Sequence, residues 1–175
     1  TGGQNWLVSS TADNNDFLAR KLLGLESADP VGIEMLQNAD GGWGSAAGYR
    51  SNPGDSALVL QALGRHGRDN TLVVDKALSY LITAQSLDGG WNPGTGANTI
   101  LSTSNILLAL NQYRGKNSNV SDARISSALS WLEARQNSDG GFGDQFSSVY
   151  ESAAALLALK VSGGSPVRID HAIDY

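Results

Sequence analysis

The sequence predicts an all-α protein built from repeated pairs of helices. One phrase, in which Gln is followed by Asp-Gly-Gly and an aromatic residue, occurs three times, beginning at Gln37, Gln85 and Gln136. The first two copies begin 48 residues apart and the last two begin 51 residues apart, which is a spacing typical of repeat proteins. Helical periodicity flanks the copies, and no segment shows a convincing strand pattern.

The helix before the phrase is predicted to be amphipathic. In residues 73–85 and again in 121–136, apolar residues recur at helical spacing on one side, while the other side carries Asp122, Ser126, Glu133 and Arg135. Such helices have one face exposed to water. The apolar stripes consist of Val74, Ala77, Leu78, Leu81 and Ile82 in the first helix and of Ile125, Ala128, Leu129 and Leu132 in the second.

The helix after the phrase is apolar on nearly all sides, in residues 55–63, 103–110 and 151–159. A helix of this kind is normally buried on several sides. A serine recurs before each apolar run, and an acidic or hydroxyl residue precedes the serine, which suits the start of a helix. These residues are Asp55 and Ser56, Thr103 and Ser104, and Glu151 and Ser152.

The alternation of the two helix types predicts two layers. The apolar helices would form the inner layer and the amphipathic helices the outer layer. A solenoid that stacks the same pairs in parallel is an alternative that satisfies the same pattern.

The phrase resembles the QW repeat of squalene and terpene cyclases and of protein prenyltransferase β-subunits. The resemblance covers roughly residues 30–175 in three copies, each followed by a serine-led apolar helix. It implies an α/α toroid, in which inner and outer helices alternate around a central cavity. The toroid of this family needs about six helix pairs, so we expect an incomplete barrel of three to four inner and outer pairs.

The resemblance also implies a structural role for the phrase. The glutamine is expected to bond to backbone groups at the start of a neighbouring helix, its carbonyl accepting from an unpaired N–H, with the aromatic ring stacked over it. We call this arrangement the QW clasp. Its members are Gln37 with Trp43, Gln85 with Trp91, and Gln136 with Phe142. The glycine pair of each copy would permit a tight turn, and the aspartate would suit that turn.

The chain is predicted to be one toroid domain over residues 1–175, divided into repeats of about 30–70, 71–119 and 120–165. A weak further copy is expected over residues 1–29, because Trp6 and Phe17 show the same eleven-residue step as Trp131 and Phe142. Residues 166–175 resemble the start of the helix at 72–80, so we expect another repeat to begin there and the natural protein to continue.

Composition excludes several classes of function. The net charge of −5 disfavours nucleic-acid partners. No apolar run reaches the roughly 20 residues that a membrane-spanning helix needs. The chain has no cysteine, which excludes disulfides and Cys-ligated zinc. We predict no metal and no cofactor.

No catalytic motif of the resembled families is present. Squalene-hopene-type cyclases protonate their substrate with a D-x-D-D motif, and the nearest segment here, from Asp13 to Asp16, does not match it. The histidines, His66 and His171, are not placed like the zinc ligands of prenyltransferases. No catalytic residue is therefore predicted.

The ends of the inner helices offer a candidate ligand site. Their first residues would meet at one rim of the cavity, with Tyr49 and Tyr150 nearby, where they either cap helices or line a polar pocket. The predicted rim residues are Asp55, Ser56, Thr103, Ser104, Glu151 and Ser152. A small molecule, a glycan or a protein is the expected kind of ligand.

Two functional hypotheses remain open at this point. The first is a non-catalytic binding or scaffold module of a larger secreted or cell-surface protein, which the missing catalytic motifs favour. The second is a fragment of a cyclase-like, prenyltransferase-like or polysaccharide-lyase-like enzyme whose catalytic residues lie outside this chain. In either case, the apolar flanks of an open arc are expected to drive self-association.

Overall fold

The structure, a computed structural model, describes residues 2–11, 14–94 and 96–175. This described part is helical and contains no β-strand, only two isolated bridge pairs. The predicted all-α class is therefore confirmed. The helices are α1 (Gly2–Ser9), α2 (Asn15–Gly24), α3 (Val31–Glu34), α4 (Pro53–Arg65), α5 (Leu72–Thr83), α6 (Ile100–Tyr113), α7 (Asp122–Glu133), α8 (Val149–Ser162) and α9 (Pro166–Asp174).

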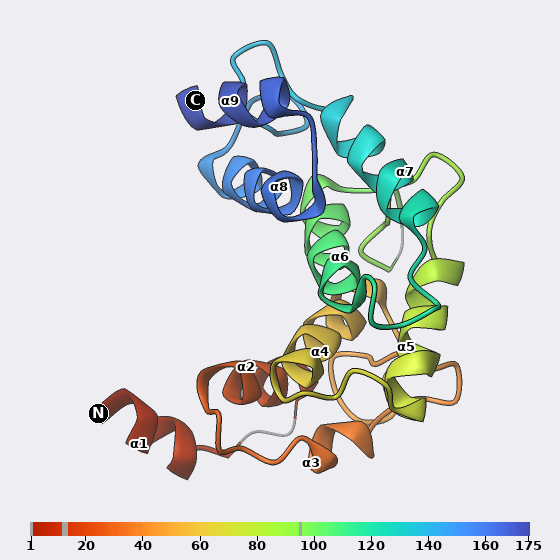
Figure 1. The fold of residues 1–175 in the computed structure, drawn as a ribbon. Coiled ribbons are helices and arrows are strands. Elements are labelled where there is room, and N and C mark those ends of the chain that lie inside the picture. Colours follow the sequence, from red (N-terminus) through yellow and green to blue (C-terminus); the bar gives the residue numbers. More distant parts are fainter. Residues whose placement is uncertain (1, 12–13, 95) are drawn as a thin grey trace.

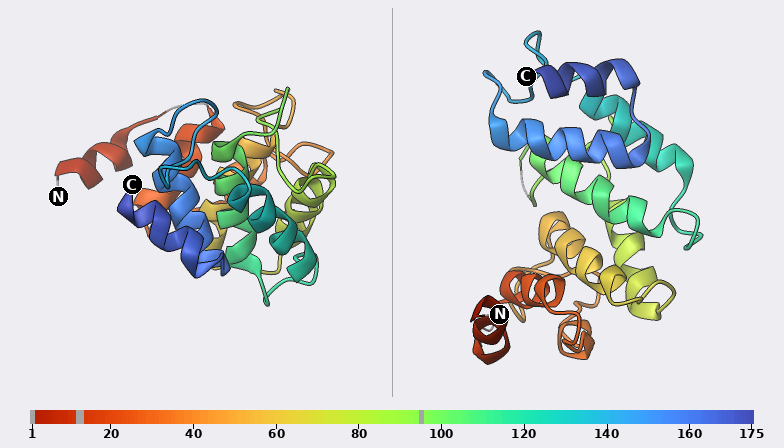
Figure 2. Two further views of the ribbon diagram at one scale, coloured as in Figure 1. Left: turned by 90° about the horizontal axis from the view of Figure 1, so that it is seen from above. Right: turned by 60° about the vertical axis from the view of Figure 1, so that its left-hand side comes forward.

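The helices form a curved double layer that is open on one side (Figure 1). Helices α2, α4, α6 and α8 line the inside of the arc, and α3, α5, α7 and α9 lie outside them. Each inner helix packs against its inner neighbours, α4 between α2 and α6, and α6 between α4 and α8. The two further views in Figure 2 show the same stacking. This is the predicted incomplete α/α toroid.

The inner helices begin earlier than the repeated serines predicted. The side chains of Asn52, Thr99 and Ser148 cap α4, α6 and α8 by accepting a backbone N–H from the first turn. The residue four positions after each cap is Ser56, Thr103 or Ser152, already inside the helix. In the second repeat, the residue equivalent to Ser56 and Ser152 is therefore Thr103. The expectation from the sequence that Ser104 takes this place is wrong by one residue.

The predicted apolar stripes of the outer helices face inward. In α5, Val74, Ala77, Leu78 and Leu81 are buried and Ile82 is partly buried. In α7 the buried set also includes Trp131, which the periodicity did not select. Both layers contribute to one core together with the three clasp aromatics, Trp43, Trp91 and Phe142.

The first segment differs from the predicted weak repeat. Phe17 lies within the first turn of α2, whereas the clasp aromatics precede their inner helices. The eleven-residue step from Trp6 therefore does not mark a clasp. Instead, the Trp6 and Phe17 rings pack edge to face, with centroids 6.4 Å apart. Lys21 holds the same junction by donating to the carbonyls of Val8 and Ser10.

Candidate functional site

The three clasp glutamines make the same pair of hydrogen bonds. Each side-chain amide donates to the carbonyl of the first glycine in its own turn, at 2.8 or 2.9 Å. The same nitrogen donates to a carbonyl in the first turn of the next outer helix. Those acceptors are Val73 for Gln37 at 2.8 Å, Arg124 for Gln85 at 3.1 Å and Arg168 for Gln136 at 2.8 Å.

These bonds reach the start of a neighbouring helix, as the resemblance implies, but their direction differs from the expected one. The glutamine donates to backbone carbonyls, and its own carbonyl does not accept a helix N–H. An arginine on the next outer helix instead donates to the side-chain oxygen in two copies, Arg124 to Gln85 and Arg168 to Gln136, both at 3.3 Å.

The aromatic members connect the clasp to both helices of their own repeat. The indole N–H of Trp43 donates to the carbonyl of Ile33, and that of Trp91 to the carbonyl of Leu81. Both carbonyls lie in the preceding outer helix. The backbone N–H groups of the three aromatic residues donate to the hydroxyls of the inner helices, namely Ser56, Thr103 and Ser152.

The aspartate of each copy stabilises the turn. One oxygen of Asp139 accepts from the Gly141 N–H and from the Ser147 hydroxyl, and these bonds, with Ser147 the larger cause, lower the pKa of the Asp139 carboxyl. Asp40 and Asp88 bond in the same way to their glycine and to Ser51 or Asn98. Ser51, Asn98 and Ser147 lie outside the repeated phrase, and only their distance of eight to eleven residues from the aspartate could have indicated them.

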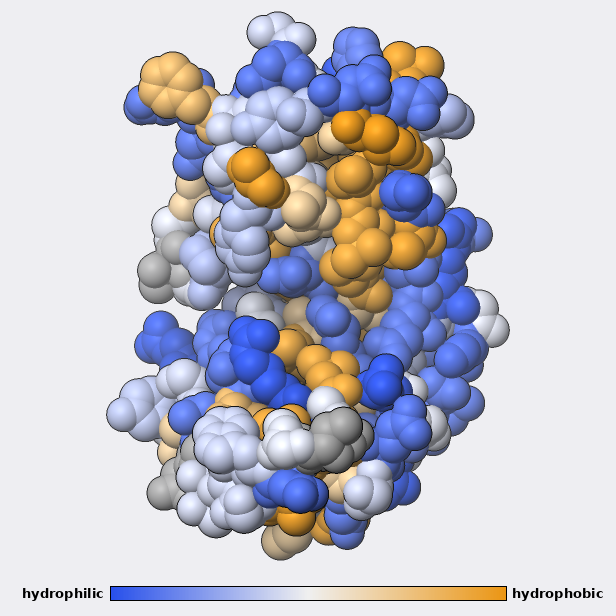
Figure 3. All heavy atoms as spheres, turned by 90° about the vertical axis from the view of Figure 1, so that its left-hand side faces the viewer, coloured by the Kyte–Doolittle hydropathy of each residue, from blue (hydrophilic) through white to orange (hydrophobic). Residues whose placement is uncertain are grey.

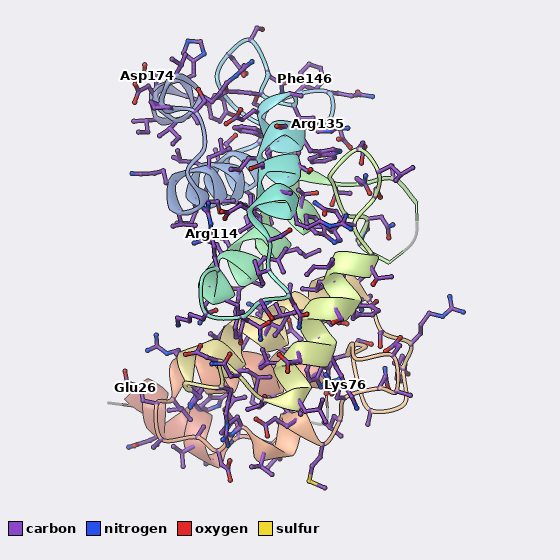
Figure 4. All side chains as sticks on the ribbon, turned by 45° about the vertical axis from the view of Figure 1, so that its right-hand side comes forward. Glu26, Lys76, Arg114, Arg135, Phe146 and Asp174 are labelled. Atoms are coloured by element: carbon purple, nitrogen blue, oxygen red, sulfur yellow. The ribbon has the colours of Figure 1, made fainter. Side chains whose placement is uncertain are left out.

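The junction around the middle clasp carries an additional contact. The indole N–H of Trp131 in α7 donates to Asp88 at 2.9 Å, and the guanidinium of Arg135 lies 3.5 Å from the centre of the Trp131 ring (Figure 4). At the preceding junction, burial and then the carboxylates of Asp40 and Asp55 raise the pKa of Tyr80 to about 12. An aromatic side chain of the outer helix thus lies near the aspartate of the previous clasp at both junctions.

The direction of the clasp bonds can be tested at Gln37, because the residue in the place of Arg124 and Arg168 is Val73 in this copy. Gln37→Glu is expected to lower the free energy of unfolding at neutral pH by about 2–3 kcal/mol, because a carboxylate cannot donate to the two carbonyls. Gln37→Met is the control, since it removes the bonds without adding charge. In urea titration Gln37→Glu should lose more free energy than Gln37→Met, because its carboxylate also places a negative charge beside the two carbonyls. A smaller loss for Gln37→Glu than for Gln37→Met would show that the side-chain oxygen, and not the amide N–H, makes the bonds.

The same variant has a predicted pH dependence. The carbonyls favour the neutral form of the new carboxyl and raise its folded pKa above the unfolded value of about 4.3. The stabilisation from the protonated form is therefore complete below about pH 4.3 and is lost as the pH rises through the folded pKa. Relative to the unmodified chain at each pH, Gln37→Glu should recover stability on acidification.

A second candidate site lies on the inside of the arc. A cleft of about 390 Å³ is lined by residues of the four inner helices, with leucine side chains beside polar ones. Arg20 and Asp16 form an ion pair there at 2.9 Å, and the hydrogen bond to Asp16 raises the pKa of Arg20. The cleft is lined by Asp16, Arg20, Leu23, Gly54, Asp55, Leu58, Gln61, Asn105 and Tyr150.

The structure separates the predicted rim residues. Asp55 lines the cleft, and its carboxylate accepts from the amide of Asn52. Glu151 is partly buried and bonds to Ser148. Ser56, Thr103, Ser104 and Ser152 are buried, so their side chains do not reach the cleft. Of the two tyrosines expected nearby, Tyr150 lines the cleft, whereas Tyr49 does not contribute to its lining. Asp13, from the segment compared with the D-x-D-D motif, lies outside the described residues.

Among the described residues, no group of three or more His, Cys, Asp or Glu side chains is placed to hold a metal ion. No helix in this part of the chain combines the length and the apolar character needed to cross a membrane.

The curved double layer and the repeated clasp define an α/α toroid of the squalene- and terpene-cyclase type. The family model of the squalene-hopene cyclase C-terminal domain matches residues 50–164. Because this match covers more than half of the chain, the protein belongs to that family, and it is a terpene cyclase-like domain segment.

Individual relatives agree with this assignment. The squalene–hopene cyclase of Bradyrhizobium diazoefficiens is 28% identical over an alignment that covers 79% of this chain and 25% of the relative. The drimenyl diphosphate synthase of Streptantibioticus cattleyicolor is 43% identical over 59 residues, which cover 34% of this chain and 11% of that enzyme. The chain thus spans about a quarter of the length of the cyclase from Bradyrhizobium.

A solved structure shows the same fold. The ent-copalyl diphosphate synthase from Streptomyces platensis superposes with a TM-score of 0.76 at 24% sequence identity, over 91% of this chain and 33% of that one. The similarity supports the arrangement of inner and outer helices.

Proposed function

We propose that the chain forms part of the wall of an isoprenoid-binding cavity in a terpene-cyclase-type barrel and that the proton donor of such an enzyme lies outside residues 1–175. This corresponds to the second hypothesis from the sequence, the enzyme fragment. Membership of the squalene-hopene cyclase family supports it over a secreted scaffold module. The absence of a D-x-D-D motif supports placing the acid elsewhere.

The observation that carries the proposal is the apolar register on the inside of the arc. In each inner helix, the residue nine positions after the N-terminal cap remains at least partly accessible. These residues are Leu23, Gln61, Leu108 and Leu157, so three of the four are leucine, and Leu23 and Gln61 line the cleft. Leu58 adds a further apolar side chain to the cleft. Figure 3 faces the open side of the arc and shows hydrophobic residues gathered in its upper part. An aligned series of leucines suits a hydrocarbon chain.

The charges on the inside of the arc also favour an apolar ligand. Arg20, which lines the cleft, is paired with Asp16 at 2.9 Å. A cleft whose arginine is neutralised by a carboxylate is better suited to the hydrocarbon part of an isoprenoid than to a diphosphate group. The diphosphate in the names of some relatives would therefore have to be held elsewhere.

The proposal predicts saturable binding of farnesol, an uncharged isoprenoid alcohol, by the chain. Leu58→Asn, inside the arc, should weaken binding at least about tenfold, because it replaces apolar contact area with a polar amide. Leu72→Asn is the matched control, since Leu72 is an exposed leucine of the outer helix α5. Isothermal titration calorimetry is the measurement, with thermal melting to verify that both variants are folded. Absence of binding, or equal affinity of the two variants, would contradict the proposal.

A further inference from the structure

The cleft inside the arc combines two leucines with neutral polar side chains. In Figure 1, α2 and α4 form the lower part of the arc, and α6 and α8 form its upper part. Leu23 and Leu58 come from the lower pair of helices, whereas Asn105 and Tyr150 come from the upper pair. Leu58 and Asn105 are each the sixth residue after the N-terminal cap of their helix. The same position of the inner layer is therefore apolar in α4 and polar in α6.

Most of the other polar side chains in the cleft already have partners within the chain. Asp16 and Arg20 form an ion pair, and the carboxylate of Asp55 accepts from the amide of the α4 cap. The amide of Gln61 donates to the backbone carbonyl of Asn105 at 3.1 Å, which fixes α6 beside α4 at this point. A ligand is not required to satisfy these groups.

Asn105 and Tyr150 differ in this respect. The bond from Gln61 reaches only the backbone of Asn105, and its side-chain amide has no partner among the residues that the structure describes. The Tyr150 hydroxyl likewise has none in that part of the chain, and both exposed side chains line the cleft. A hydrocarbon in the cleft would displace water from these groups without replacing its hydrogen bonds, which disfavours binding. A hydroxyl group, which both donates and accepts, would replace them.

The charge of the lining disfavours an anionic head group on the ligand. The residues that line the cleft include the carboxylates of Asp16 and Asp55 and the guanidinium of Arg20. With two negative charges against one positive charge, a phosphate or a carboxylate would be repelled. A neutral oxygen is not subject to this repulsion.

We propose that Asn105, together with Tyr150, selects isoprenoids that carry a neutral hydroxyl group over isoprenoid hydrocarbons. The hydrocarbon part of the ligand packs on Leu23 and Leu58, and the hydroxyl group bonds to the Asn105 amide and the Tyr150 hydroxyl. This inference rests on the proposed function, because it specifies which isoprenoids the wall accepts.

The selectivity is tested with farnesol and deoxyfarnesol, the hydrocarbon in which hydrogen replaces the hydroxyl group. Competition against radiolabelled farnesol gives both dissociation constants, and their ratio is the quantity to compare. Asn105→Leu should reduce the preference for farnesol at least about tenfold, because it replaces a hydrogen-bonding group with the apolar side chain that α4 has at this position. Tyr150→Phe, which keeps the ring, should shift the ratio in the same direction.

Asn5→Leu is the matched control, because Asn5 is an exposed asparagine of α1 that does not line the cleft. Its ratio of dissociation constants should equal that of the unmodified chain. If both ligands bind and Asn105→Leu, verified as folded by thermal melting, leaves the ratio unchanged, the hydroxyl assignment is overturned while the isoprenoid-binding wall stands. If neither ligand binds the unmodified chain, the proposed function itself is contradicted, and this inference with it.

Discussion

Trp91→Ala is expected to lower the free energy of unfolding by about 3–5 kcal/mol, because it removes a completely buried ring and leaves a cavity. The substitution also leaves the carbonyl of Leu81 without the indole N–H that donates to it at 2.7 Å. Denaturant titration followed by circular dichroism measures the loss.

Trp6→Ala is the matched control, because Trp6 is 62% exposed and packs mainly against Phe17. Its expected effect is below about 1 kcal/mol. If Trp91→Ala were as mild as Trp6→Ala, the clasp aromatic would not be part of the core that joins the two layers.

The second large effect is expected for Gly89→Ala, at about 2–5 kcal/mol. Gly89 has a φ of +98°, which disfavours any residue with a Cβ by about 1–2 kcal/mol. An added Cβ would also lie 2.4 Å from the carbonyl oxygen of Ser127 in α7, and relieving this overlap adds about 1–3 kcal/mol. The free energy of unfolding from urea titration is the quantity to compare.

Gly48→Ala separates the two contributions. Gly48 has a similar φ of +77°, but an added Cβ there would meet no atom within 4 Å. The control should therefore show only the backbone penalty. Equal losses for the two variants would mean that close approach to the next outer helix does not explain the glycine pair.

Much of this fold could be predicted because the signals are local and repeated. Three copies of one phrase predicted the length of the repeat. The helical spacing of apolar residues predicted which side of α5 and α7 faces the core. The helix starts were harder to locate, because Asn52, Thr99 and Ser148 are different residues and share only the ability to accept a backbone N–H. Because serine occupies the fourth position after the cap in the other two repeats, the sequence suggested Ser104 as their equivalent. The cap of α6 at Thr99 instead places Thr103 there.

The candidate site was less predictable, because it depends on which side chains of distant helices meet. Asp55 and Tyr150 are 95 residues apart in the sequence and line one cleft. No local sequence pattern predicts that these two residues lie close together. The ion pair of Arg20 and Asp16 is visible as a four-residue spacing on a helix. Its position on the inside of the arc follows only from how α2 packs against α4.

The glutamine bonds also determine the order in which the parts of this molecule unfold. Each glutamine connects its own turn with the following outer helix and with nothing farther along the chain. Stability is therefore transmitted from one neighbour to the next, as in a row of coupled units. Unfolding should begin at the two ends of the arc and progress toward its centre, so that the amides of α4 and α6 exchange with solvent last. A destabilising substitution at one junction should leave the distant repeats folded.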